Sequence, residues 1–174
     1  MSLNTQIIGK TMPHGFAGTY ARQPDMIVNT RPVGGTESIP FGTALKYDNG
    51  KVIVMGGTGT TAAQFAGIAG SEVKSALVYP DQNGGKYAPG EACSVFQRGS
   101  INVLCQRGTP ALGGDVYVRI AKTADYSTAL VGGFEAEADD KTAGNSVKLT
   151  NCQWGGAADA NGVVELVILT RANA

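Results

Sequence analysis

Three cysteines and one histidine are the residues of this chain whose chemistry could include nucleophilic attack, metal binding or a disulfide. Cys93 and Cys105 lie within PGEACSVFQRGSINVLC, and Cys152 follows later, with no CxxC pair among them. A catalytic thiol needs a neighbouring base, and His14 is the only histidine available. A structural zinc site needs four ligands, which these residues do not supply at suitable spacing. We therefore expect no metal site.

The alternation of side chains along a strand gives these cysteines another role. Cys105 falls on the same face as Ile101 and Val103, and Cys93 falls on the same face as Val95. Free cysteine is among the most frequently buried residue types. The pattern predicts that Cys93 and Cys105 are small buried or half-buried hydrophobic side chains.

A glycine-rich stretch, KVIVMGGTGTTA, satisfies the loose fingerprint of a dinucleotide-binding turn. That fingerprint works only where a helix N-terminus faces the pyrophosphate inside a βαβ unit. Here Gly67 and Gly70 would fall within the helix, and alternating strands and helices do not follow. We expect no cofactor, no small-molecule substrate and no catalytic residues.

Four carboxylates gather in FEAEADDK, at Glu135, Glu137, Asp139 and Asp140. Their alternate spacing could place Glu135 and Glu137 on one side of a strand, where oxygen ligands could bind a cation such as calcium. The spacing does not fit an EF-hand loop, and the composition of the stretch predicts a solvated loop instead.

Length and charge narrow the class of protein. A chain of 174 residues is expected to form one domain. Fourteen basic residues balance fourteen acidic ones, which argues against nucleic acid or an anionic membrane as partner. No apolar run approaches the roughly 18 residues of a membrane span, and the first residues do not resemble a signal peptide. We expect a protein made and kept in a cytosol.

Short apolar runs separated by glycine and proline predict many strands. A β-hairpin is expected at 43–55 around Asp48-Asn49-Gly50, with further strands at 25–30, 91–97, 101–106, 115–120 and 162–170, and a helical turn at about 60–66. The fold class is therefore mainly β: a single barrel-like or jelly-roll-like β-sandwich with at most one or two short helices. Prolines recur through residues 1–40, and these residues are expected to form an extended N-terminal arm before a domain at 41–174.

Several pieces of sequence, taken in order, resemble one known family. They are HGFAGTYA, SIPFGTAL, FAGIA, YAPGEACSVFQRGSINVLC and ALGGDVYVRI, within residues 14–120, together with the final hydrophobic strand. This order is similar to that of the structural cement proteins of tailed bacteriophages, which decorate capsids from outside. Residues 121–162 match nothing in that pattern.

The resemblance implies a non-enzymatic β protein of the virion, assembled in the bacterial host cytoplasm and bound to the outer surface of the capsid. It implies two partners, the major capsid protein and further copies of the chain, as a homodimer or a homotrimer. Its role would be to bridge neighbouring capsid subunits.

The apolar residues of the arm are the candidates for contacts between chains: Met12, Phe16, Tyr20, Met26 and Ile27. The alternative, that they pack on their own domain, stays open, because apolar anchors are typical of both. Two other functions also stay open, namely a tail or other virion β module and, resting on the glycine-rich stretch, a dinucleotide-binding oxidoreductase.

Overall fold

The computed structural model describes residues 13–72 and 84–172. Their regular secondary structure is almost all strand, as the sequence predicts, and their helical content is one 3-10 turn, η1 (Ala62–Gln64). The strands are β1 (Tyr20–Pro32), β2 (Ile39–Pro40), β3 (Ala44–Asp48), β4 (Lys51–Val54), β5 (Phe65–Ala69), β6 (Lys86–Tyr87), β7 (Ala92–Leu104), β8 (Val116–Arg119), β9 (Phe134–Glu135), β10 (Ser146–Leu149), β11 (Cys152–Trp154) and β12 (Val163–Ile168). No helix in the described ranges is long and apolar enough to cross a membrane.

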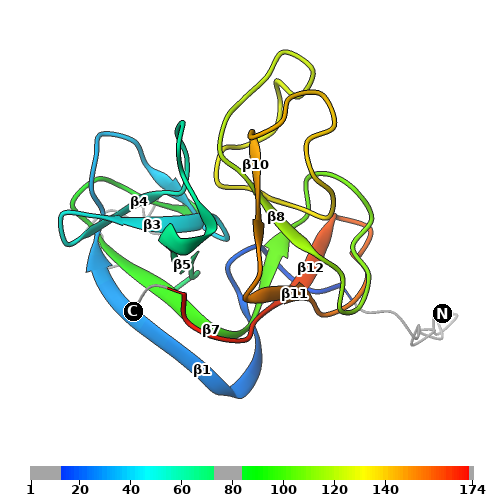
Figure 1. The fold of residues 1–174 in the computed structure, drawn as a ribbon. Helices are drawn as coiled ribbons and strands as arrows, with labels where there is room; N and C mark the ends of the chain where they lie inside the picture. The colour runs from blue at the N-terminus through cyan, green and yellow to red at the C-terminus, as the bar shows by residue number, and fades with distance from the viewer. Residues whose placement is uncertain (1–12, 73–83, 173–174) are drawn as a thin grey trace, which may run out of the picture.

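The largest sheet is built around β7 (Figure 1). Its order is β11-β12-β7-β5-β3-β4, and β1 pairs with β7 as an additional neighbour. On one edge β7 meets β1 along nearly its whole length, and on the other it meets β5 first and β12 later. The predicted hairpin is confirmed, with β3 and β4 paired on either side of Asn49 and Gly50.

A second, three-stranded sheet of order β10-β8-β9 faces part of the first sheet. Val116 and Val118 of β8 share a buried cluster with Ile101 and Val103 of β7, and Trp154 of β11 belongs to the same cluster. Two sheets that bury their apolar faces against each other make a sandwich. The arrangement confirms the predicted β-sandwich class, without closure of the described strands into a barrel.

A second buried cluster lies beside β7. Val95 and Cys93 pack there with Leu45 and Val52 of the hairpin and Tyr87 of β6. The alternation predicted for the two cysteines is confirmed: Cys93 shares this cluster with Val95, whereas Cys105 packs, half-buried, against the cluster of Ile101 and Val103. One strand therefore contributes to both apolar cores.

The two strands predicted at 91–97 and 101–106 are in fact one, and that prediction is wrong. Gly99, which lies between the two predicted ranges, is inside β7 with φ of +101°. A Cβ atom at this position would lie 2.1 Å from the carbonyl oxygen of Asp25, so glycine permits the close approach of β1. The register of β1 against β7 shifts here, between Arg22 and Val28, and the chain bends without leaving the sheet.

Residues 20–32 of the predicted arm form β1, which pairs with β7 from Tyr20↔Ile101 to Pro32↔Ala92. The strand predicted at 25–30 is therefore present and longer than expected. Beyond it, Val33 makes an isolated bridge to Val52 of β4. The division into an arm at 1–40 and a domain at 41–174 stays a prediction.

Candidate functional site

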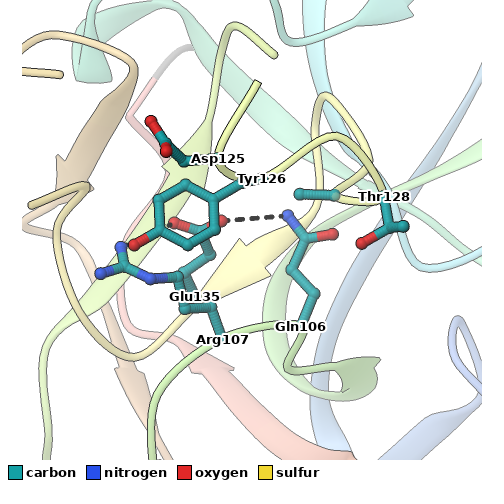
Figure 2. A pocket seen from close by; sticks show the side chains of 7 residues that line it. Gln106, Arg107, Asp125, Tyr126, Thr128 and Glu135 are labelled. Carbon is teal, nitrogen blue, oxygen red and sulfur yellow. Dashed lines mark hydrogen bonds and ion pairs between the residues drawn. The ribbon is translucent and has the colours of Figure 1, made fainter. Parts of the chain in front are cut away.

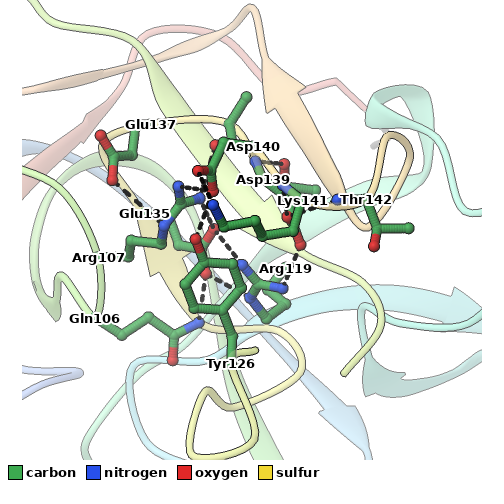
Figure 3. Close-up of polar contacts among 12 residues, drawn as sticks. Gln106, Arg107, Arg119, Tyr126, Glu135, Glu137, Asp139, Asp140, Lys141 and Thr142 are labelled. Carbon is green, nitrogen blue, oxygen red and sulfur yellow. Dashed lines mark hydrogen bonds and ion pairs between the residues drawn. The ribbon is translucent and has the colours of Figure 1, made fainter. Parts of the chain in front are cut away.

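The carboxylate-rich segment predicted as a solvated loop holds the most concentrated polar site of the described residues. Arg119, at the end of β8, is fully buried and binds the buried Glu135 of β9 through two nitrogens, at 2.5 and 3.1 Å. A third nitrogen of Arg119 lies 2.8 Å from a carboxylate oxygen of Asp139. The strand pairing of β8 with β9 brings these residues together (Figure 3).

Tyr126 covers this ion network from the solvent side. Its ring centre lies 4.5 Å from the guanidinium carbon of Arg107 and 4.9 Å from that of Arg119, and its hydroxyl donates to Asp140. A guanidinium over the face of an aromatic ring is attracted by the ring quadrupole. We call Arg107, Arg119, Tyr126, Glu135 and Asp139 the Arg119 cluster.

A pocket of about 250 Å³ opens beside the Arg119 cluster. Figure 2 shows Gln106 and Glu135 converging there, joined by a hydrogen bond of 3.3 Å from the Gln106 amide to the carboxylate. The other lining residues are Arg107, Asp125, Tyr126, Thr128 and Ala129. The carboxylate at the base of this pocket is already held by Arg119, so the pocket is lined by groups engaged with one another.

The prediction of a solvated loop is wrong for Glu135 and Asp139 and right for Glu137 and Asp140. The side chains of Glu135 and Asp139 are 0% and 1% exposed, whereas those of Glu137 and Asp140 are more than half exposed. Sequence spacing does not reveal that a buried arginine would lie opposite them. The cation that Glu135 and Glu137 both approach is Arg107, at 3.9 and 3.3 Å.

The charge on Asp139 is stabilised by its surroundings. Burial by itself would raise the pKa of this carboxyl group, but the backbone N–H of Thr142, the Arg119 guanidinium and the backbone N–H of Lys141 together lower the pKa to about 2. Asp139 therefore stays ionised and holds residues 139–142 against the end of β8. The cluster fastens the segment between β8 and β10 to the sheet.

The cysteines lie in surroundings that favour the thiol form. Burial raises the pKa of Cys93 to about 12, and burial also raises the pKa values of Cys105 and Cys152. All three are free, and among the described residues no group of three or more His, Cys, Asp or Glu side chains could hold a metal ion. A nucleophilic cysteine needs a lowered pKa, so these environments fit a packing role.

The glycine-rich stretch that raised the oxidoreductase alternative does not lead into a long helix. After β4 the chain passes through Gly57 and Gly59 and then forms only η1. The next element is β5, a fully buried strand. The helix that would face a pyrophosphate in a dinucleotide-binding turn is thus a single 3-10 turn in this chain.

The five candidate contact residues of the arm lie in different environments. Met12 lies outside the described residues. Tyr20 stacks on Phe96 with ring centres 5.3 Å apart, and Met26 packs against the main core, so both touch their own chain. Ile27 is half-buried in β1. Whether any of the five also contacts another chain stays a prediction.

Phe16 differs from the others, because its side chain is 81% exposed on a fixed turn. The backbone N–H of Gly18 donates to the carbonyl of Asn102 at 2.7 Å, and the backbone N–H of Asn102 donates to the carbonyl of Thr19 at 2.8 Å. The backbone N–H of His14 donates to Asp159, and the Asn102 amide donates to the carbonyl of His14. A large apolar side chain is thereby presented to solvent from a held backbone.

Other exposed apolar side chains were not among the sequence-based candidates. They are Leu104, Leu112, Leu130 and Leu169, and Leu112 is as exposed as Phe16. Leu112 stands directly before Gly113-Gly114, and a leucine next to a glycine turn is the only sequence signal that could have suggested its exposure.

Comparison with protein families identifies the chain. Residues 3–169 match the family model described as "Structural cement protein (E217 gp24/Pam3 gp6)". The chain belongs to this family of phage structural cement proteins. The match extends the resemblance noted in the sequence through residues 121–162. The role of this cement protein is therefore structural, within the phage capsid.

The fold of this cement protein is also found among solved structures. A chain of "The capsid of Myoviridae Phage XM1" matches with a TM-score of 0.64 and 19% identity, over 99% of this chain and 98% of that one. No curated protein matches the cement protein.

Proposed function

We propose that this cement protein binds the outer surface of a phage head and bridges neighbouring major capsid protein subunits. It assembles in the bacterial host cytoplasm and associates with further copies of itself. The observation that carries the proposal is the family match over residues 3–169. The chain with the same fold in "The capsid of Myoviridae Phage XM1" supports a place in the shell.

The exposed apolar side chains support a binding role for the surface. Phe16 and Leu112 each expose 81% of their surface, and aromatic side chains such as that of Phe16 are enriched in protein interfaces. Many weak contacts combine on a shell, because a tethered oligomer raises local concentration to about the millimolar range. The absence of net charge limits repulsion between copies on a crowded lattice.

The binding test uses expanded phage heads that lack the cement protein. Purified protein should bind them saturably at micromolar concentration and raise the temperature at which they disrupt. Phe16→Ala should lower occupancy, whereas Leu169→Ala removes an exposed apolar side chain at the C-terminal end as a matched control. Wild-type protein that leaves the heads bare at micromolar concentration would overturn the proposal.

The contribution of the N-terminal arm to binding can be separated from that of the rest of the chain, called the body here. Deleting residues 1–12 removes Met12 and spares β1, whereas a deletion that reaches residue 25 would remove part of the main sheet. If the truncated protein occupies fewer sites on the heads while its unfolding temperature is unchanged, the arm contributes to binding. If its occupancy is unchanged, the body makes the binding contacts.

The tail-module alternative predicts a different place in the virion. Electron microscopy of virions whose cement protein is labelled at its C-terminus distinguishes the two places, since label on the tail would contradict the capsid proposal. The oxidoreductase alternative predicts thermal stabilisation by nicotinamide dinucleotides, of roughly 2.7 kcal/mol at about 100 times the dissociation constant. A titration in which the dinucleotides leave the unfolding temperature unchanged would exclude the oxidoreductase alternative.

A further inference from the structure

The turn that carries Phe16 is held by residues far away in the sequence. The backbone N–H of His14 donates to the carboxylate of Asp159 at 2.9 Å, and the Asn102 amide donates to the carbonyl of His14 at 2.7 Å. These partners lie 145 and 88 positions from His14 along the chain. Residues 14–19, which we call the Phe16 turn, are therefore fixed by the folded domain and not by local sequence alone.

A second set of contacts fixes the other side of the Phe16 turn. Gly18 has a φ of +88°, and a Cβ atom there would lie 2.9 Å from the Cβ of Phe41 and 3.0 Å from the carbonyl oxygen of Ala69. Glycine permits this close approach. The carbonyl of Gly18 also accepts from the backbone N–H of Ser71 at 2.7 Å. The turn is thus attached both to β7 and to the end of β5.

Phe16 is the large apolar side chain of this ordered turn, and it projects into solvent. Gly18 is buried and Ala17 is half-buried, whereas the Phe16 side chain is largely exposed. The Phe16 carbonyl accepts from the backbone N–H and the hydroxyl of Thr19, at 3.1 and 2.7 Å. An exposed apolar side chain adds little to the stability of its own chain. Its fixed position is therefore better explained by a contact with another protein.

We propose that Phe16 is an anchor that enters a concave apolar pocket on the partner, and that Asp159 and Asn102 are positioning residues that present it. Interface anchors fill well-packed, desolvated pockets, and phenylalanine is enriched in interface cores. A single side chain that projects from a turn between small residues fits a concave surface better than a flat one. The inference rests on the proposed function, in which the partner is the major capsid protein, and names the contact residue within it.

The hydrogen bonds of the Phe16 turn should strengthen binding, because they order the turn before the partner arrives. A loop that becomes ordered only on binding loses conformational freedom at that moment, and this loss weakens the complex. In the free protein the Phe16 turn is already ordered by Asp159 and Asn102. A variant that releases the turn should therefore bind more weakly even though it keeps Phe16.

The geometry of Asp159 allows this release to be made selectively. One carboxylate oxygen accepts from the backbone N–H groups of Asn161 and Val163, at 2.8 and 3.0 Å, and the other accepts from His14. The amide oxygen of an asparagine can keep the first two hydrogen bonds, but its NH2 group then faces the His14 N–H and cannot accept from it. Asp159→Asn thus removes the tie to the Phe16 turn and spares the turn at 159–163.

Binding to expanded heads that lack the cement protein tests the anchor. Phe16→Ala should raise the half-saturating concentration about tenfold or more. Phe16→Leu should stay within about threefold of wild type, because leucine keeps most of the apolar volume. Leu169→Ala removes an exposed apolar side chain elsewhere and should also stay within about threefold.

A double variant tests the positioning role. Asp159→Asn should raise the half-saturating concentration about fivefold and lower the unfolding temperature by no more than about 4 °C. Phe16→Ala/Asp159→Asn should bind no more weakly than Phe16→Ala, since Asp159 acts through the side chain that it positions. Asp25→Asn removes the same charge from an exposed ion pair and should change binding less than about twofold.

Hydrogen exchange of the free protein gives a measurement that is independent of the heads. In Asp159→Asn the amides of residues 16–19 should exchange faster than in wild type, whereas those of β7 at 93–98 should be unchanged. Equal exchange of residues 16–19 in the two proteins would overturn the positioning role of Asp159.

The binding outcomes separate this inference from the proposed function. Heads that take up Phe16→Ala as well as wild type would overturn the anchor and leave the proposed function standing. Losses that add in the double variant would show that Asp159 affects binding independently of Phe16, and would overturn the positioning role. Wild-type protein that leaves the heads bare would overturn the proposed function, and the anchor with it.

Discussion

The β7-centred apolar body and the Arg119 cluster are held together by opposite means. The body buries alternating apolar side chains from neighbouring strands, such as Phe96, Ile101 and Val103. The Arg119 cluster buries charges, which are expensive to remove from water unless each one is paired. Any apolar side chain of similar size contributes to the body, whereas the cluster depends on particular partners.

That difference bears on how the two regions should respond to change. A cavity in the body loses contacts in proportion to its size. Loss of one charge from the cluster leaves its partners buried and uncompensated. Substitutions in the two regions should therefore lower the free energy of unfolding for different reasons, and only the cluster should be sensitive to which charged partner remains.

Phe96→Ala should lower the free energy of unfolding by about 3–5 kcal/mol, because it opens a cavity at the strand shared by both cores and removes the stacking partner of Tyr20. Guanidinium denaturation followed by tryptophan fluorescence measures the loss. Phe16→Ala is the matched control, and its effect should stay within about 0.5 kcal/mol because Phe16 is exposed. Equal losses would mean that Phe16 packs against the body.

Arg119→Met should lower the free energy of unfolding by about 3 kcal/mol, near the lower end for a broken buried pair, because Arg107 and Gln106 still approach Glu135. Hydrogen exchange should show faster opening of residues 121–146 than of β7. Adding Glu135→Leu should recover part of the loss, since it removes the unpaired charge. A neutral single variant would contradict the view that this charge is structurally required.

Acid should weaken the Arg119 cluster more than the apolar body. The pKa of Asp139 is lowered from 3.8 to about 2 in the folded protein, so its contribution is complete above about pH 4 and is lost as pH falls through 2. The unfolding temperature should fall as pH is lowered from 5 to 2, and that of the Asp139→Asn variant should fall less steeply. Residual dependence is expected from Glu165, whose pKa is also lowered: burial opposes the shift, and the ion pair with Arg22 outweighs it.

Tyr126→Leu should have the smallest effect, a loss of about 0.5–1 kcal/mol, because the ring covers two guanidinium groups at a partly exposed site. Tyr126→Phe keeps the ring and removes only the hydroxyl that donates to Asp140, so it should cost less. Denaturant titrations of both variants compare the two contributions. A larger loss for the phenylalanine variant would assign the stabilisation to the hydroxyl.

Much of the body could be predicted, because period-two alternation is a local property of the chain. The hairpin around Asn49-Gly50, the faces of Cys93 and Cys105, and the buried final strand all follow from neighbouring residues. The prediction failed at Gly99, where a glycine permits the close approach of β1 instead of a turn. That approach depends on residues more than seventy positions earlier in the chain.

The sequence by itself determined the β class, the strand faces and the family, because each rests on local pattern or on the order of short motifs. Only the tertiary structure decided which carboxylates are buried, since that depends on Arg119 arriving from a strand that is separate in sequence. The pairing of β1 with β7 was decided there too. A strand has the same sequence whichever strand it pairs with, and only the positions of the other strands decide its partner.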